Sequence, residues 1–274
     1  MTLPTFFVIG AAKSGTTSLY HYLDEHPEVF MSPVKETNHF ASAEEASGQG
    51  RVAGPDEYEA LYEGAGGATA VGEASPLYLR SRVAAERIHR AVPDARIIAI
   101  LRNPTDRAYS GYLMQVRKGR ERRPIGECFE RGDVYIEAGF YADDLARFYE
   151  RFDRRGIRIY LFDELVADPQ LLMSDLFTFL GVDGTFRVGV EKRYNVGGMP
   201  RRRWLANFGA SGFVRWLRDN APESGKRLGR GVRDANLEKP PPMPPELRER
   251  LRELYREDIE RVQELTGKDL SAWE

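Results

Sequence analysis

The chain has 274 residues and a formal net charge of -2, and 42% of its residues are hydrophobic and 30% charged. This composition excludes an intrinsically disordered chain, and no apolar stretch reaches the roughly 20 residues of a membrane span. Cys128 is the only cysteine, which excludes an internal disulfide and a cysteine-based metal site. Because the first predicted strand begins near residue 6, too few residues precede it for an apolar signal sequence, and we expect a cytoplasmic protein.

The first predicted elements are a buried strand, a short loop and a helix. Phe6 to Gly10 is a continuous apolar run that ends in glycine, as in a parallel strand covered on both faces. A helix is predicted to begin at Thr16, and the small residues before it let backbone N–H groups converge on an anion. Lys13 adds a positive charge. The order resembles a P-loop, except that Thr16 follows Gly15 where a nucleoside triphosphatase has lysine.

Further along, apolar runs typical of buried strands alternate with segments of helical periodicity. This alternation predicts an α/β fold with a P-loop-like, doubly wound parallel sheet flanked by helices. We expect a single domain over residues 1–274, with its core at 1–186, a packed helix at 245–265 and a loop-rich helical substrate-side region at 187–244. The other predicted strands are 70–75, 96–101 and 157–162, and the other predicted helices include 56–62, 83–92, 104–116 and 171–180.

Residues 32–40 form a proline-containing loop that carries Lys35, Glu36 and His39. Loops held by a rigid scaffold are where functional residues concentrate. Taken alone, however, Glu36 beside Lys35 reads as a surface ion pair, and His39 beside Phe40 as a histidine packed in a loop. The position of this segment after the anion-binding loop favours a functional role.

A second candidate site begins where the strand at 96–101 ends. Arg102 leaves the carboxyl end of that strand, and Ser110 lies two helical turns into the next helix. Ligands of open α/β sheets bind at this edge, a guanidinium binds phosphate bidentately and a serine hydroxyl donates a further hydrogen bond. The pair therefore suits a second phosphate group.

Together these elements resemble the binding loops of sulfotransferases that use 3'-phosphoadenosine 5'-phosphosulfate (PAPS). Lys-Ser-Gly-Thr-Thr at 13–17 is similar to the phosphosulfate loop of that family, and Arg102 with Ser110 to the residues that hold the 3'-phosphate. Residues 35–40 and 72–78 are similar to two substrate-side motifs of the carbohydrate branch, which includes the heparan sulfate enzymes and bacterial relatives. The resemblance covers most of the chain and is weakest from 188 to 244.

The resemblance implies transfer of a sulfuryl group from PAPS to a hydroxyl or amine of a carbohydrate, lipid or secondary-metabolite acceptor. The product would be adenosine 3',5'-bisphosphate (PAP), with no metal required. Lys13 would stabilise the transition state, and Glu36 would be the base, with His39 as its rival. The implied nucleotide-binding residues are Lys13, Ser14, Gly15, Thr16, Thr17, Ser18, Arg102, Ser110, Gly198 and Arg201, and the implied substrate-side residues are Lys35, Glu73 and Ser75.

The sequence differs from the heparan sulfate enzymes at two positions of these motifs, and it leaves two other functions open. Heparan sulfate members often have histidine where Asn38 stands and lysine where Ala74 stands, so the acceptor can differ from theirs. One alternative is a P-loop-like small-molecule kinase, which the displaced lysine disfavours. The other is a non-enzymatic module that binds a polyanion through the arginine-rich segments 117–123 and 201–203. We expect no nucleic-acid partner.

Overall fold

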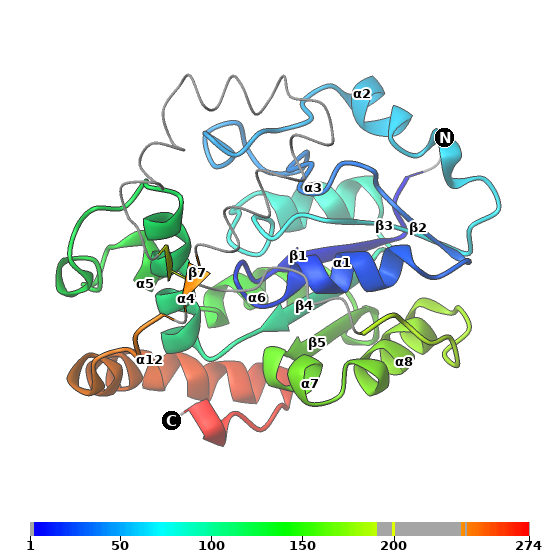
Figure 1. Cartoon of the computed structure of the whole chain (residues 1–274). Coiled ribbons are helices and arrows are strands. Elements are labelled where there is room, and N and C mark those ends of the chain that lie inside the picture. The colour runs from blue at the N-terminus through cyan, green and yellow to red at the C-terminus, as the bar shows by residue number, and fades with distance from the viewer. Residues whose placement is uncertain (1–2, 191–198, 201–236, 239, 274) are drawn as a thin grey trace. The chain divides into compact units, whose positions relative to one another are not determined.

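The computed structural model describes residues 3–190, 199–200, 237–238 and 240–273 (Figure 1). The chain divides into two compact units. The first unit comprises Met1–Asn103, Phe140–Asn195 and Arg256–Glu274, and the second comprises Pro104–Gly139 and Val196–Tyr255. Gly198, Arg201 and the basic segment 201–203 lie outside the described residues.

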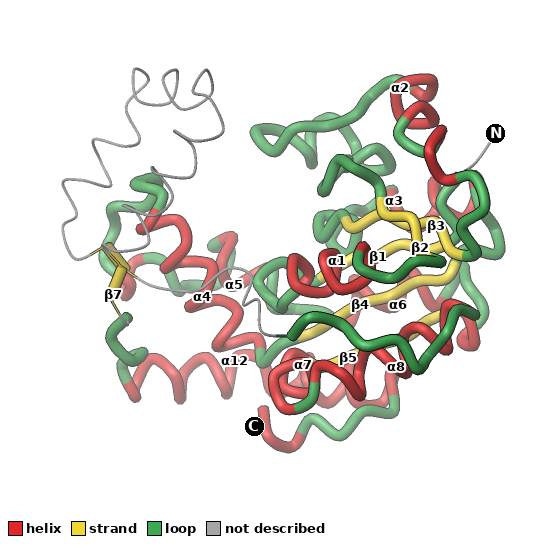
Figure 2. Tube along the Cα trace, turned by 45° about the vertical axis from the view of Figure 1, so that its right-hand side comes forward, coloured by secondary structure: helices red, strands yellow, loops and turns green. Residues whose placement is uncertain are grey.

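The first unit contains a five-stranded parallel sheet with the strand order β2-β3-β1-β4-β5. This sheet confirms the predicted fold class, and Figure 2 shows the helices that flank its yellow strands. Because β1 has β3 on one side and β4 on the other, its carboxyl end lies where the strand order reverses, which is where open α/β sheets bind ligands. The strands are β1 (Phe6–Gly10), β2 (Val29–Met31), β3 (Ala70–Ala74), β4 (Arg96–Leu101) and β5 (Ile157–Leu161).

Burial explains why these segments form central strands. Every residue of β1 and of β3 is buried, as the continuous apolar runs predict for strands covered on both faces. Gly72 of β3 is required by packing, because a Cβ atom there would lie 2.2 Å from the ring of Phe6. The register pairs these two residues directly.

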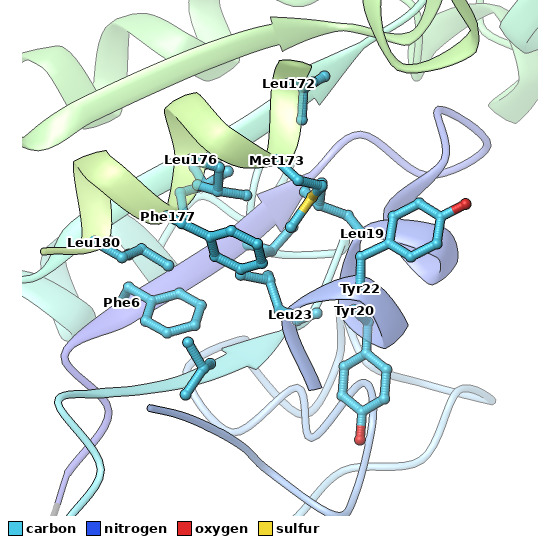
Figure 3. Packing of buried hydrophobic residues seen from close by; sticks show 14 of the residues in the cluster. Phe6, Leu19, Tyr20, Tyr22, Leu23, Leu172, Met173, Leu176, Phe177 and Leu180 are labelled. Atoms are coloured by element: carbon cyan, nitrogen blue, oxygen red, sulfur yellow. The ribbon is translucent and has the colours of Figure 1, made fainter. Parts of the chain in front are cut away.

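Among the described residues, six α-helices belong entirely to the first unit. α1 and α8 contribute Leu19, Leu23, Met173 and Phe177 to an apolar cluster that also contains Phe6 of β1 (Figure 3). Burial of such side chains stabilises each by roughly 1.5–3 kcal/mol, so this layer fixes the start of α1 against the sheet. The six helices are α1 (Thr16–Asp24), α2 (Pro55–Ala60), α3 (Ala84–Ala91), α6 (Ala142–Tyr149), α7 (Phe162–Ala167) and α8 (Pro169–Leu180).

The second unit contains α4 (Pro104–Arg117), α5 (Val134–Glu137) and an antiparallel pair, β6 (Met199–Pro200) with β7 (Leu237–Glu238). α12 (Pro245–Thr266) begins in this unit, where the Tyr255 hydroxyl donates to the carbonyl oxygen of Ile136 at 2.8 Å, and it ends in the first unit. No helix among the described residues is both long and apolar enough to cross a membrane.

Candidate active site

The loop between β1 and α1 presents a backbone shaped to receive an anion. Lys13 and Gly15 have positive φ angles of 74° and 96°, and α1 begins directly afterwards at Thr16. The N–H groups of the first helical turn have no partners within the helix and carry its positive dipole end. The first turn contains no acidic side chain that would occupy this position.

Ser14 and Gly15 provide two further signs of an anion site. The Ser14 side chain is fully buried, and its hydroxyl has no hydrogen-bond partner among the described residues. A buried hydroxyl without a partner is costly, so a ligand oxygen at this position would relieve the cost. Gly15 is fixed by packing, because a Cβ atom there would lie 2.9 Å from Leu165 and 3.1 Å from Phe162. These features fit the phosphosulfate group that the sequence implies.

Arg102 lies beside this loop. Its Nη1 donates to the carbonyl oxygen of Lys13 at 3.4 Å, and its guanidinium carbon lies 4.7 Å from the centre of the Phe162 ring. The Tyr141 hydroxyl donates to the carbonyl oxygen of Arg102 at 2.9 Å, which fixes the backbone at the end of β4. The structure therefore brings Arg102 and the phosphate loop together. Ser110 lies on α4 within the second unit, and its pairing with Arg102 stays a prediction.

The acidic loop, residues 32–40, is held along the carboxyl end of β3. Each of the residues 72–75 accepts a hydrogen bond from this loop, so the strand end determines the course of the loop residue by residue. The four bonds run from Ser32 N to Gly72 O (2.8 Å), Glu36 N to Ala74 O (3.0 Å), Thr37 Oγ1 to Glu73 Oε2 (2.5 Å) and Asn38 N to Ser75 Oγ (3.2 Å).

Two residues of this loop have left-handed backbone conformations, Glu36 with φ 64° and Asn38 with φ 51°. Asparagine tolerates this region better than most residues. Asn38 is buried, and its Nδ2 donates to the carbonyl oxygen of Gly50 at 3.0 Å. The Asn38 side chain thus ties the acidic loop to residue 50, which gives a structural reason for an asparagine at this position.

Glu36 is the most accessible of the candidate catalytic groups in the acidic loop. Its side chain is 47% exposed, and one carboxylate oxygen lies 2.5 Å from Nζ of Lys35. Exposed ion pairs of this kind contribute little to stability, so a stabilising role does not explain why Lys35 and Glu36 are both present. An accessible carboxylate can receive a proton from the acceptor molecule. The ammonium group of the neighbouring lysine can attract an acceptor molecule that carries a negative charge.

His39 is packed more tightly than Glu36. Its ring stacks on Tyr58 with 4.0 Å between ring centres, and Nδ1 lies 2.8 Å from the carbonyl oxygen of Val52. Because a carbonyl oxygen only accepts hydrogen bonds, Nδ1 carries the proton of the neutral ring and Nε2 keeps a lone pair. Partial burial lowers the pKa of His39, helped by the charges of Arg51 and Arg87, although the hydrogen bond to Val52 opposes the shift. The lowered pKa favours the neutral ring, which retains one basic nitrogen.

Glu73 and Ser75 lie beneath the acidic loop and are fully buried. Burial raises the pKa of Glu73 to about 7, although hydrogen bonds from Thr37 and Tyr62 oppose the rise. The family resemblance implies that both residues lie on the substrate side. In the structure they accept hydrogen bonds from Thr37 and Asn38 of the acidic loop. Sequence reasoning overlooked Thr37 and Phe162, although Phe162 stands directly at the carboxyl end of a predicted strand.

A model of the sulfotransferase family matches residues 32–186, which is more than half of the chain. The chain belongs to the sulfotransferase family. It is therefore a transferase, and the family is the one that the phosphate loop and the Arg102 segment indicate. Among the described residues, no three or more His, Cys, Asp or Glu side chains are grouped so as to hold a metal ion.

Curated relatives of this sulfotransferase include larger enzymes. It is 27% identical over 292 residues to the mouse bifunctional heparan sulfate N-deacetylase/N-sulfotransferase 4, covering 99% of this chain and 31% of that protein. It is 31% identical over 132 residues to the membrane-associated sulfotransferase kil1 of Dictyostelium discoideum, covering 47% of this chain and 27% of that protein. The chain thus spans about a third or less of the length of these relatives.

Two solved structures have a similar fold. A sulfotransferase from Alicyclobacillus acidocaldarius matches with a TM-score of 0.76 and 30% identity over 100% of this chain and 99% of that one. A sulfotransferase domain from the curacin biosynthetic pathway matches with a TM-score of 0.50 and 18% identity over 68% of this chain and 76% of that one, which supports the fold alone.

Proposed function

We propose that this sulfotransferase transfers the sulfuryl group of PAPS to a hydroxyl or amine of a carbohydrate acceptor. The observation that carries the proposal is the phosphate loop, in which the buried Ser14 hydroxyl has no hydrogen-bond partner within the described part of the chain while α1 begins at Thr16. The neighbouring Arg102 supplies a second cation on the same sheet edge, as a nucleotide with two separate phosphate groups requires. The carbohydrate acceptor follows the heparan sulfate named in the curated relatives.

On the donor side, the chain binds and neutralises negative charge. The N–H groups at Gly15, Thr16 and Thr17 would hold the 5'-phosphate together with the Ser14 hydroxyl, while Ser18 lies in the same helical turn. Lys13 would neutralise the charge that develops on the bridging oxygen as its bond to sulfur breaks. This charge develops only in the transition state, so the lysine raises the rate rather than the affinity.

On the acceptor side, Glu36 would remove the proton of the attacking hydroxyl or amine as the new bond to sulfur forms. Its exposure and its place on the loop beside β3 allow an acceptor to reach it. His39 is the rival base, because its Nε2 keeps a lone pair while Nδ1 is bound to Val52. Lys35 would attract an anionic acceptor. In-line transfer needs positioning and charge stabilisation, and these residues supply both.

The proposal is tested by the effect of nucleotides on thermal stability. A ligand that binds only the native state raises the melting temperature by mass action, so PAP should stabilise the protein more than ADP or AMP. The substitution Arg102→Ala should remove most of this preference, at a cost of about 1.5–3 kcal/mol for a lost charge-assisted contact. Arg82→Ala is the matched control, because Arg82 is exposed in the same unit.

Equal stabilisation of the wild-type protein by PAP, ADP and AMP would overturn the proposal. Stabilisation by ATP with magnesium above that by PAP would support the kinase alternative instead. Binding of heparin with a steep salt dependence, together with no response to any nucleotide, would support a polyanion-binding module.

A further inference from the structure

Glu73 is a buried carboxyl group that an acceptor cannot reach directly. It is fully buried near the end of β3, with Tyr58, Tyr62 and Tyr78 around it. Its Oε2 accepts hydrogen bonds from Thr37 Oγ1 at 2.5 Å and from the Tyr62 hydroxyl at 3.4 Å, while Oε1 has no partner within hydrogen-bond distance among the described residues. A buried carboxylate that is only partly hydrogen-bonded is costly, so packing alone does not explain its presence.

Thr37 connects this carboxyl group to the acidic loop. It lies between Glu36 and Asn38, whose φ angles of 64° and 51° make the backbone turn sharply on either side of it. The Thr37 side chain is fully buried, and its Oγ1 also lies 3.2 Å from the Tyr78 hydroxyl. A displacement of Thr37 would therefore rotate the peptide groups on both sides and redirect the Glu36 side chain.

The same connection reaches His39. The N–H group of His39 points to Thr37 Oγ1 at 3.4 Å, and the Thr37 carbonyl oxygen accepts the N–H of Val52 at 2.9 Å. The carbonyl oxygen of Val52 in turn accepts a hydrogen bond from Nδ1 of His39 at 2.8 Å. Glu36 and His39, the two candidate bases, are thus oriented by a loop in which the Thr37 side chain is hydrogen-bonded to Glu73.

We propose that Glu73 is a positioning residue, which holds residues 35–39 through Thr37 in the conformation that presents Glu36 and His39 to the acceptor. The inference rests on the proposed function, because it concerns the acceptor side of the same site. Glu73 has no role in donor binding under this proposal, because the donor side is assigned to residues 13–18 and Arg102. Displacement of a reacting group by about 1 Å lowers a rate by roughly 10²-fold, so the loss should fall on turnover.

Two matched pairs of variants test the link. Thr37→Val and Glu73→Leu remove the hydrogen bond, whereas Thr37→Ser and Glu73→Gln keep a donor or an acceptor in place. With labelled PAPS and N-desulfated heparin as the acceptor, the first pair should lose roughly 10²-fold in kcat. The second pair should regain most of the activity. The KM for PAPS and the thermal shift with PAP should stay at the wild-type values in all four variants.

Hydrogen exchange provides a measurement that needs no acceptor. In Thr37→Val and Glu73→Leu, the amides of residues 35–40 should exchange faster, while those of residues 11–18 stay protected in the presence of PAP. Unchanged exchange at 35–40 would overturn the inference. A loss of PAP stabilisation in step with the loss of turnover would also overturn it, because Glu73 would then support the whole fold. Failure of PAP to stabilise the wild-type protein would instead overturn the proposed function.

Discussion

Single residues in this chain take up unusual backbone conformations where the chemistry is expected. Lys13 and Glu36 both have positive φ angles, which are uncommon for residues other than glycine and asparagine. Such conformations persist only where the surrounding structure enforces them. The Arg102 side chain donates to the carbonyl oxygen of Lys13, and the carbonyl oxygen of Ala74 accepts the N–H of Glu36, so both conformations are held by residues at the carboxyl ends of β4 and β3.

The choice between Glu36 and His39 as the base can be made by substitution. Glu36→Gln keeps the shape of the side chain but cannot accept a proton at neutral pH, so turnover should fall by roughly 10²–10⁴-fold. His39→Ala should cost less. Steady-state rates of sulfuryl transfer to N-desulfated heparin would measure both losses, and the thermal shift with PAP would report donor binding separately.

The opposite ranking would exchange the two roles. If His39→Ala were inactive and Glu36→Gln nearly normal, the Nε2 lone pair of His39 would be the base. Glu36 would then be only the partner of Lys35 in a surface ion pair. Ala43→Gly serves as a control for unspecific effects in this region, because Ala43 is exposed just beyond the loop.

The sequence predicted the chemistry of these residues better than their surroundings. Lys13 and Arg102 could be selected because each follows an apolar run, and Glu36 because it lies in the proline-containing loop after the anion-binding loop. The burial of Glu73 and Ser75 could not be predicted, since it depends on residues 32–40 folding back over the end of β3. That return is fixed by hydrogen bonds between segments about 40 positions apart, and such contacts leave no local pattern in the chain.

At the scale of the elements, the strands were predictable because parallel strands buried on both faces read as continuous apolar runs. β1, β3, β4 and β5 begin and end within one residue of the predicted bounds. α7 was not predicted, because it follows β5 without a loop and begins at Phe162, which reads as the last residue of the strand. This short helix is important, since it places Phe162 and Leu165 against the phosphate loop.

The contact between α7 and the phosphate loop predicts that Gly15→Ala is harmful. The left-handed φ of 96° disfavours alanine, and the added Cβ would meet Leu165 at 2.9 Å. We expect destabilisation of about 1–3 kcal/mol and a loss of PAP binding, because the N-terminus of α1 would shift. Urea unfolding and the thermal shift with PAP would measure the two effects.

Gly66→Ala is the matched control for this substitution. Gly66 has a φ of -55°, and a Cβ atom there would meet no atom of the described residues within 4 Å. Alanine at this position should leave stability unchanged or raise it slightly, by restricting the unfolded chain. Equal behaviour of the two variants would mean that α7 does not constrain the phosphate loop.

At the scale of the whole molecule, we expect two buried carboxyl groups in the first unit to make stability depend on pH. Burial raises the pKa of Glu73 from 4.5 to about 7 and that of Asp258 from 3.8 to about 6. Asp258 accepts hydrogen bonds from the N–H groups of Tyr141 and Ala142 at the start of α6, and Glu73 accepts them from Thr37 and Tyr62. In each case the folded state favours the protonated form more than the unfolded state does.

This difference predicts the direction of the pH dependence. A raised folded-state pKa gives a contribution to the free energy of unfolding that is fully present below the unfolded pKa and is lost as the pH rises through the folded pKa. For Glu73 the loss should fall between about pH 4.5 and pH 7 and amount to on the order of 3 kcal/mol. Urea unfolding of the wild-type protein and of Glu73→Gln at several pH values would show it as a fall in the stability of the wild type relative to Glu73→Gln as the pH rises. Asp258→Asn should change the dependence in the lower window, between about pH 4 and pH 6, and leave the upper part intact. If the difference in the free energy of unfolding between wild type and Glu73→Gln stayed constant from pH 4.5 to 8, the Glu73 carboxyl group would have the same pKa in the folded and unfolded chain. Water would then solvate this group in the folded protein.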